Sequence, residues 1–340
     1  MICFAWHGFP QYAARCVGSF VKATAERVVV IATKPLVPIV GMERAVGCEL
    51  IWIVDEDDTR DIASLCGEIP RVLFVAGWWV PAFNRYRDQV GGRGGRVVSL
   101  VDNNFRFSVR ELIKAFRFRM FLRRKYDGYL VPGASGRRLL RFYGVSDERI
   151  RNGLYSADET LFTCSKPMAK RVKKILFVGQ LNARKNIVPF ARAFLKANNN
   201  REWVLEICGC GPDKMKIPKD ATIIVHDFVQ PEELAGIYQS ARVFALPSLE
   251  EHWGVVVHEA ALSGCILLLS DRIGAAVDFG GPDNSVSFNP FSEDEMASAI
   301  KKSMALSDDE MLRASKESVK LGAKINKRLF VCSVFEFAKA

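Results

Sequence analysis

The stretch RVFALPSLEEHWGVVVHEAALSGCILLLSD, from Arg242 to Asp271, decides the fold that this chain can adopt. An apolar run comes first, followed by a polar loop, a segment with apolar residues at helical spacing, and a second apolar run, CILLLS. Short apolar runs separated by a helix are typical of parallel strands that helices cover on both faces. The stretch therefore predicts a strand–helix–strand unit of a doubly wound sheet.

The same alternation continues along the chain, with helix-length amphipathic segments such as NIVPFARAFLKAN and EELAGIYQSA between apolar runs. The predicted strands are MICFAW, RVVVIA, ELIWIV, RVLFVAG, RVVSLV and DGYLVP in the first half, and KKILFVG, WVLEICG, TIIVHDF, RVFALPS and CILLLS in the second. At 340 residues the chain is long enough for two domains, and the polar segment from Ala157 to Lys174 is the best break. We expect an α/β protein of two doubly wound, Rossmann-like parallel-sheet domains facing a central cleft.

Composition and the first residues bear on the compartment. A chain that is 49% hydrophobic and 25% charged has a soluble, globular composition. The start, MICFAWHGFP, lacks the basic residues and apolar run of a secretory signal. The longest apolar stretch, Arg27 to Met42, is interrupted by Lys34 and Pro35 and falls short of the ~18 apolar residues of a membrane-spanning helix. We expect a cytoplasmic protein that does not cross a bilayer.

The nine cysteines do not predict a metal site. None forms a CxxC pair, and the closest two, Cys208 and Cys210, lie in an apolar strand with no histidine nearby in sequence. We therefore expect reduced, mostly buried thiols, with no metal and no cofactor.

Loops that follow strands are where a doubly wound sheet binds ligands. In the opening stretch a helix is predicted to begin near Gly254, and its first backbone N–H groups, with Val255 next, would be unpaired donors suited to a phosphate. Glu251 would project beside that point, and Glu259 could accept hydrogen bonds from a ribose diol. The plainer alternative, acids favoured by the helix dipole and by solvent, accounts for each acid separately but not for the order of the preceding loops.

Two of those preceding loops carry glycine. The strand KKILFVG ends in Gly179 and leads through Arg184 and Lys185 into a helix, so that backbone and cations could both meet phosphate oxygens. The strand WVLEICG runs into Gly209 and a tight turn. Each loop taken alone is also compatible with an ordinary surface turn.

These motifs together resemble the donor-binding half of family 4 retaining glycosyltransferases of the GT-B fold. The resemblance runs from Ile175 to about Ile300 and is carried by FVGQL…RK, CGCGP, HDFVQPEELAGIYQSARVFALPS, and E-HWGVVVH-E followed by AALSGC. In that family the first glutamate lies by the donor sugar and the second binds the ribose, which implies these roles for Glu251 and Glu259. The family usually has Arg directly after the first-loop glycine, where this chain has Gln180, and Arg184 is the candidate replacement.

The N-terminal half resembles the family more loosely, with HGFPQY standing where the family has a Gly-rich turn facing the donor phosphates. The resemblance implies an acceptor-binding domain over residues 1–162, a sugar-nucleotide-binding domain over 163–322, and a C-terminal helix over 323–340 that packs back toward the first domain. The catalytic residues implied are Glu251, Lys185 and Arg184; the donor-binding residues are Gly8, Gly179, Gln180, Gly209, His252, Trp253, Gly254, Val255 and Glu259; the acceptor-binding candidates are Trp78, Trp79, Asp102, Asn103 and Asn104.

The implied function is a retaining, metal-independent hexosyltransferase. It would move a sugar from a UDP- or GDP-linked donor, a substrate rather than a cofactor, to a glycan or lipid-linked acceptor in cell-envelope polysaccharide or lipopolysaccharide assembly. Retention by front-face attack, with the leaving phosphate as base, needs no separate protein nucleophile. The sequence names neither the donor base nor the sugar.

A competing hypothesis starts from ELIWIVDEDD, a strand that ends in two aspartates, Asp55 and Asp57. Such a pair can hold a divalent ion against a nucleotide diphosphate, as in GT-A glycosyltransferases. A solvated acidic turn explains the same residues.

Basic residues are concentrated between Phe105 and Tyr143, where eleven Lys or Arg accompany two acids, a net charge of +9. Residues 105–125 interleave Arg with Phe, Leu and Met at helical spacing, which favours an amphipathic helix on an anionic membrane. Binding of single-stranded nucleic acid is the alternative. The lipid hypothesis predicts peripheral association with the inner face of the membrane and no nucleic-acid partner.

Overall fold

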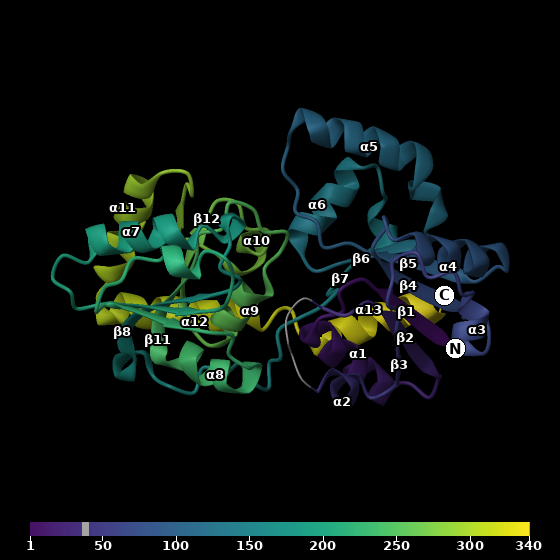
Figure 1. Cartoon of the computed structure of the whole chain (residues 1–340), viewed down its shortest axis with the longest axis horizontal. Coiled ribbons are helices and arrows are strands. Elements are labelled where there is room, and N and C mark those ends of the chain that lie inside the picture. Colours follow the sequence, from purple (N-terminus) through teal and green to yellow (C-terminus); the bar gives the residue numbers. More distant parts are fainter. Residues whose placement is uncertain (36–40, 340) are drawn as a thin grey trace. The chain divides into compact units, whose positions relative to one another are not determined.

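The computed structural model describes residues 1–35 and 41–339 of the chain (Figure 1). The chain divides into a first unit, Met1–Ser156 with Ile325–Ala340, and a second unit, Ala157–Lys324, and each is described by itself. Residues 157–162, which the sequence prediction assigned to the first domain, lie with the second unit. The Ala157 N–H donates to His258 Nδ1 at 3.0 Å, and the Phe162 ring packs edge-on against Tyr238.

The first unit is built on seven parallel strands in the order β3-β2-β1-β4-β5-β6-β7. Their bounds are β1 Ile2–Trp6, β2 Val28–Ala32, β3 Glu49–Trp52, β4 Val72–Ala76, β5 Arg96–Leu100, β6 Gly128–Val131 and β7 Ile150–Asn152. The chain order reverses at β1, which pairs with β2 on one side and β4 on the other. The sequence prediction missed β7, because three residues ending in Arg151 and Asn152 give no periodic signal.

Helices cover this sheet. Their bounds are α1 Gln11–Ala23, α2 Met42–Val46, α3 Ile62–Cys66, α4 Pro81–Gly92, α5 Val109–Phe121, α6 Ala134–Phe142 and α13 Lys327–Lys339, with short 3₁₀ turns η1 Arg123–Lys125 and η2 Asp147–Arg149. The last helix, α13, lies beside α1 although the two come from opposite ends of the chain (Figure 1). The ring of Phe330 stacks on Phe4 at 6.2 Å and Phe335 meets Phe20 at 5.0 Å, so the end of the chain completes the core of the first unit.

The second unit has six parallel strands in the order β10-β9-β8-β11-β12-β13. Their bounds are β8 Val172–Val178, β9 Val204–Cys208, β10 Ile223–His226, β11 Ala241–Leu246, β12 Ile266–Ser270 and β13 Ser285–Phe288. The chain order reverses at β8, which lies between β9 and β11. The sequence prediction missed β13, an edge strand in which serines alternate with apolar residues.

The helices of the second unit lie on both faces of its sheet (Figure 1). Their bounds are α7 Ile187–Ala197, α8 Pro231–Ser240, α9 Val255–Leu262, α10 Ala276–Phe279, α11 Glu293–Met304 and α12 Asp308–Gly322, with 3₁₀ turns η3 Met168–Lys170, η4 Ala183–Lys185 and η5 Lys214–Lys216. Helix α11 packs on α7, and α12 packs on α9. Strands such as β12 are buried throughout because helices cover both faces, which is why they read as continuous apolar runs.

The two predicted doubly wound, Rossmann-like parallel sheets are therefore confirmed. No helix within the described residues is both long enough and apolar enough to span a bilayer.

Candidate functional site

The reversal of strand order in the second unit brings two polar loops together. Strands β8 and β11 are neighbours, so the loops that follow Val178 and Leu246 leave the sheet at the same edge. The Leu249 N–H donates to the Arg184 carbonyl at 2.8 Å and ties one loop to the other. In sheets of this kind, ligands bind outside the carboxyl ends of the strands at such a reversal.

Three charged side chains meet where these loops join. One carboxylate oxygen of Glu251, Oε2, lies 2.5 Å from Lys185 Nζ and 3.1 Å from Arg184 Nη1. The Ser248 hydroxyl donates to the same oxygen at 3.3 Å. Asn182 caps turn η4, which carries both cations, because its side-chain oxygen accepts from the Lys185 backbone N–H. The structure thus brings together the three predicted catalytic residues.

Burial sets the electrostatics of this cluster. The side chains of Lys185 and Glu251 are 9% and 13% exposed. Burial lowers the pKa of Lys185 even though Glu251 favours its charged form. Burial also opposes ionisation of Glu251, but the charges of Lys185 and Arg184 outweigh it and hold the pKa of that carboxyl below its usual value. Two cations therefore share one carboxylate, a combination that can attract an anionic group to this loop.

Helix α9 begins directly beside the cluster. Its N-cap, Gly254, has φ of 95°, and a Cβ there would lie 3.1 Å from Glu251 Cγ, so glycine allows both the left-handed turn and the close carboxylate. The backbone N–H groups of Gly254, Val255 and Val256 have no hydrogen-bond acceptor among the described residues. They are donors at the positive end of a helix.

Glu259 lies farther along α9 and contacts a tyrosine that sequence reasoning missed. Its Oε2 accepts from the Tyr238 hydroxyl at 2.9 Å. Burial raises the pKa of Glu259 to about 7, although the hydrogen bond from Tyr238 favours the charged form. Burial and the Glu259 charge likewise raise the pKa of Tyr238 well above its usual value. The Glu259 carboxyl can therefore accept and donate hydrogen bonds near neutral pH.

The glycine loops that precede the cluster pack backbone against backbone. A Cβ at Gly209 would come within 1.9 Å of the Gly179 carbonyl oxygen, so only glycine permits this approach. The Gly179 N–H donates to Cys208 O at 3.0 Å, at the end of the neighbouring strand. Gln180, next in the chain, is exposed and accepts from the Asn182 amide.

The two predicted donor-binding residues that precede Gly254 differ in burial. His252 is exposed, whereas the Trp253 side chain is buried, packs against Phe279, and donates its indole N–H to Asp278 at 3.1 Å. The Trp253 ring therefore holds the loop on the core, and its predicted contact with the donor stays a prediction.

In the first unit the reversal at β1 also collects polar and aromatic groups. Gly8 follows β1, and its N–H donates to the Thr33 hydroxyl at 2.6 Å. His7 Nε2 lies 2.7 Å from Glu56 Oε1, and the Trp79 ring, 65% exposed, meets His7 edge-on at 5.7 Å. Sequence reasoning did not single out the His7–Glu56 pair, because it joins residues that follow different strands.

The other acceptor-binding candidates occupy the same edge of this sheet, in loops after β4 and β5. The Trp78 indole donates to Ser99, and the Tyr155 hydroxyl lies 3.4 Å from Asp102 Oδ2. The Asn104 side chain accepts from Ser135, and Asn103 is exposed.

Asp55 and Asp57 form a turn after β3. The Asp55 side chain accepts from the Asp57 N–H at 3.1 Å, so one of the two carboxylates caps the local backbone. Across the residues that the structure describes, no group of three or more His, Cys, Asp or Glu could hold a metal ion.

Known proteins resemble both the second unit and the whole fold. The model of the family Glycosyl transferases group 1 matches residues 172–305. Among solved structures, Anabaena HepE in complex with UDP has a TM-score of 0.75 and 11% identity, covering 99% of each chain. The E. coli trehalose-6-phosphate structure bound with UDP-2-fluoro glucose has a TM-score of 0.70 and 12% identity, covering 100% of this chain and 99% of that chain.

A third similar structure is WaaG, a glycosyltransferase involved in lipopolysaccharide biosynthesis, with a TM-score of 0.66, 14% identity and 98% of each chain covered. No curated protein matches the sequence. The structural neighbours confirm the GT-B fold, and the matched family model together with that fold supports a GT-B glycosyltransferase. A GT-A architecture, the alternative based on Asp55 and Asp57, is therefore wrong.

The raised pKa of Glu259 makes a prediction about stability. The folded protein favours the neutral form of the Glu259 carboxyl. The contribution of this group to the free energy of unfolding is therefore fully present below the unfolded pKa of about 4.5, and it is lost as the pH rises through about 7. Glu259→Gln should therefore gain stability relative to wild type between pH 5 and pH 8, on the order of 2 kcal/mol, measured by urea unfolding. Glu233→Gln, an exposed change on the neighbouring helix α8, is the control; parallel pH curves for Glu259→Gln and wild type would contradict this prediction.

Proposed function

We propose that the protein is a retaining, metal-independent glycosyltransferase of family 4 that transfers a hexose from a nucleotide-sugar donor. The observation that carries the proposal is the contact of buried Lys185 and half-exposed Arg184 with Glu251, beside the first N–H groups of helix α9. Cations and helix N–H groups together suit a diphosphate leaving group, whose negative charge grows as the sugar departs.

Each residue has a distinct role in this proposal. Lys185, with Arg184 and the N–H groups of Gly254 and Val255, stabilises the leaving diphosphate, and Arg184 supplies the cation that the family usually has at the position of Gln180. Glu251 orients the sugar, and Glu259 binds the ribose. No protein group is assigned as nucleophile, because front-face attack uses the leaving phosphate as base.

The donor is proposed to be UDP- or GDP-linked. Its support is that HepE binds UDP and the E. coli trehalose-6-phosphate structure holds UDP-2-fluoro glucose. The acceptor is proposed to be a glycan or lipid-linked glycan of cell-envelope polysaccharide or lipopolysaccharide assembly, held by the first unit through Trp79, Trp78 and the loop at Asp102. The role of WaaG in lipopolysaccharide biosynthesis supports this choice.

Product stereochemistry tests the proposal. After thermal-shift screening has selected a nucleotide sugar, transfer to a lipid-linked acceptor should proceed in excess chelator and keep the anomeric configuration of the donor, read by proton NMR early in the reaction. An inverted product would exclude the retaining mechanism. Activity that is lost in chelator and restored by Mn²⁺ would instead indicate a metal-dependent reaction.

The two glutamates should separate kinetically. A ribose contact is the same in the ground and transition states, so Glu259→Gln should mainly raise KM, whereas Glu251→Gln should chiefly lower kcat because charge develops beside it. Loss of a hydrogen bond to a charged group costs about 1.5–3 kcal/mol, or roughly 10- to 150-fold in the affected parameter. The neutral amide keeps the shape of each side chain, and circular dichroism controls for folding. Two variants with wild-type kinetics would refute both roles.

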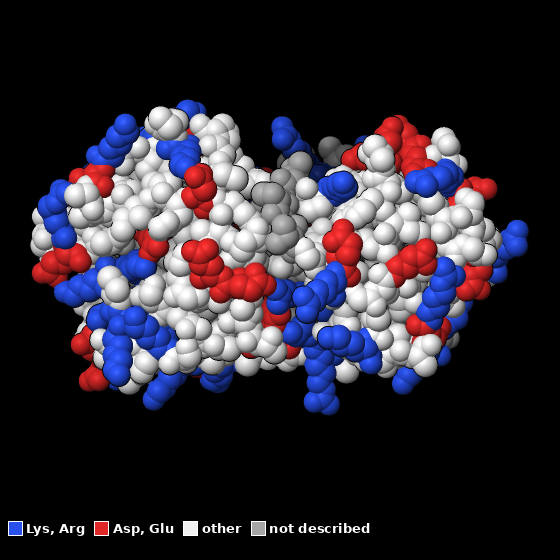
Figure 2. Space-filling view, turned by 60° about the horizontal axis from the view of Figure 1, so that its bottom comes forward, with Lys and Arg blue, Asp and Glu red and all other residues white. Residues whose placement is uncertain are grey.

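Helix α5 supports a second part of the proposal, peripheral docking on an anionic membrane through residues 105–125. Phe118 on its inner side is buried against Tyr143, while Ile113, Phe116 and Met120 on its outer side are 58%, 65% and 62% exposed. Arg110, Lys114 and Arg117 are exposed on the same helix. On the face shown in Figure 2, by contrast, basic and acidic side chains are interspersed over each unit. An exposed apolar stripe flanked by cations is typical of a helix that lies in a membrane interface.

Vesicle sedimentation checks this docking. Ile113→Ser with Phe116→Ser should weaken binding to anionic vesicles at least about tenfold, since each buried apolar side chain contributes about 1.5–3 kcal/mol. Arg110→Gln with Arg117→Gln should weaken it by ~1 kcal/mol per residue and only on anionic vesicles. Met215→Ser with Leu312→Ser, exposed apolar residues of the second unit, is the matched control. Wild-type protein that ignores vesicles but binds oligonucleotides with a steep salt dependence would favour the nucleic-acid alternative.

A further inference from the structure

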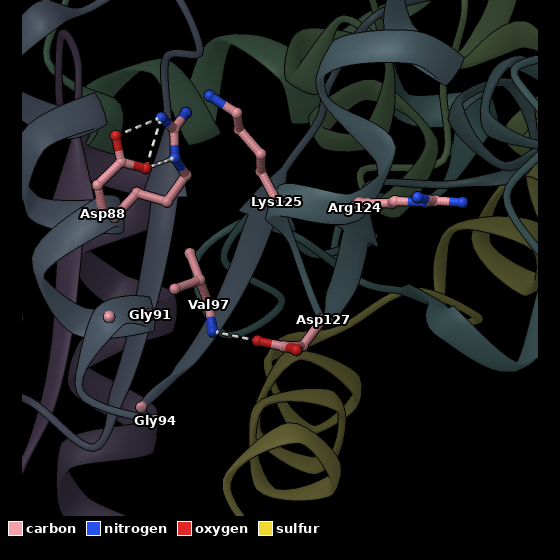
Figure 3. Close-up of a pocket in the computed structure, with 10 residues that line it drawn as sticks. Asp88, Gly91, Gly94, Val97, Arg124, Lys125 and Asp127 are labelled. Atoms are coloured by element: carbon pink, nitrogen blue, oxygen red, sulfur yellow. Dashed lines mark hydrogen bonds and ion pairs between the residues drawn. The ribbon is translucent and has the colours of Figure 1, made fainter.

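A cavity of about 440 Å³ opens in the first unit, at the edge of its sheet where strands β5 and β6 begin (Figure 3). It lies between the glycine-rich turn that ends α4, residues 91–95, and the segment from Arg124 to Asp127 that precedes β6. Val97, near the start of β5, forms part of its wall. The loops with Gly8, Trp79 and Asp102 follow the carboxyl ends of the strands, so this cavity is separate from the site of the proposed transfer reaction.

The cavity holds a buried arginine whose position is fixed on several sides. Arg87 is 5% exposed; it donates to both oxygens of Asp88 at 2.8 and 3.0 Å and to the Asn84 side chain at 2.5 Å. Its guanidinium lies over the Tyr126 ring at 5.8 Å. A charged group this enclosed keeps one orientation, which is the condition for a specific polar contact.

The charged side chains around the cavity carry a net charge of +1, from three cations, Arg87, Arg124 and Lys125, against two carboxylates. Of the two acids in the wall, Asp88 is held by Arg87, and Asp127 accepts from the Val97 N–H at 2.7 Å (Figure 3). Arg124 and Lys125 also line the cavity, and their side chains have no hydrogen-bond or ion-pair partner within the described part of the chain. The Lys125 side chain points toward the Asp88 side of the cavity (Figure 3).

The backbone conformation at two glycines of the wall would also accept other residues. Neither Gly91 nor Gly92 has a positive φ, and a Cβ at Gly92 would meet nothing within 4 Å. Glycine within a helix costs about 1 kcal/mol relative to alanine, so the end of α4 would be more stable with side chains at these positions. Because Gly91 and Gly92 have no side chains, the cavity stays open.

We propose that this cavity binds a phosphate monoester group. A monoester carries a charge of about −1.5 to −2 and three strong acceptor oxygens near neutral pH. Arg124 and Lys125 would offset part of that charge, with Lys125 as a point charge and the fixed Arg87 as a planar donor. The phosphate could come from a free phosphorylated metabolite or from the headgroup of a lipid, since Arg124 and Lys125 directly follow the exposed helix α5.

The first experiment titrates inorganic phosphate at constant ionic strength and follows the amide NMR signals of Gly91, Gly92, Gly94 and Gly95. These signals should shift in wild type, and Arg124→Gln with Lys125→Gln should weaken binding about tenfold or more, since each lost contact is a hydrogen bond to a charged group. Lys22→Gln with Arg44→Gln removes the same charge from exposed positions elsewhere in the unit and should leave the affinity within about twofold.

A third variant separates cavity binding from general attraction. Gly92→Leu keeps every charge but fills the open space, so it should also weaken phosphate binding. Three outcomes would each overturn the proposal. The first is that the glycine signals of wild type do not move. The second is that the Arg124/Lys125 variant and the Lys22/Arg44 control lose the same phosphate affinity, and the third is that Gly92→Leu keeps full affinity.

Vesicles then distinguish the two sources of phosphate. Neutral phosphatidylcholine vesicles are doped with phosphatidic acid, a monoester, or with phosphatidylglycerol, a diester, at equal surface potential. A preference for phosphatidic acid that Gly92→Leu abolishes, while Ile113→Ser with Phe116→Ser weakens binding to both vesicles, assigns the cavity to a lipid headgroup. Binding of inorganic phosphate without that preference assigns it to a free phosphorylated molecule. Neither result depends on sugar transfer, which is assayed separately.

Discussion

Parallel strands that are buried on both faces must be joined by helices, and every other feature of this protein depends on that constraint. Each connection crosses from the carboxyl end of one strand to the amino end of the next, so the loops after the strands gather at one edge of each sheet. In the second unit the reversal at β8 puts the loop after Val178 beside the loop after Leu246. Lys185 and Glu251 meet there although they lie far apart in the sequence.

The Lys185–Glu251 contact is not explained by stability alone. Removing two charges from water is costly, and a buried ion pair can often be replaced by apolar residues without loss of stability. Breaking it by removing one partner, however, leaves a buried charge uncompensated. A pair that is enclosed yet adjoins the open start of a helix is better explained by binding of an anion, which gives the cluster its place in the proposed function.

The two edges of the first sheet carry different chemistry. At the carboxyl ends, the His7–Glu56 pair and the exposed Trp79 offer hydrogen bonds and an aromatic face, which suit a sugar. At the amino ends, Arg87 and Lys125 surround a bare glycine turn and suit a small anion. Helix α5 ends at this second edge, so its exposed apolar surface is followed directly in the sequence by residues that line the cationic cavity.

The sequence by itself determined the elements with strong periodicity and the residues whose chemistry is local. Continuous apolar runs identified eleven strands, most of which are buried on both faces. The glycines and charges of the loops after β8 and β11 marked Lys185 and Glu251. Only the tertiary structure decided which residues meet across the sheet. Tyr238 reaches Glu259 from another helix, and the Trp253 ring is buried in the core. Such contacts depend on strand order and crossover, which are long-range properties that no local pattern of residues records.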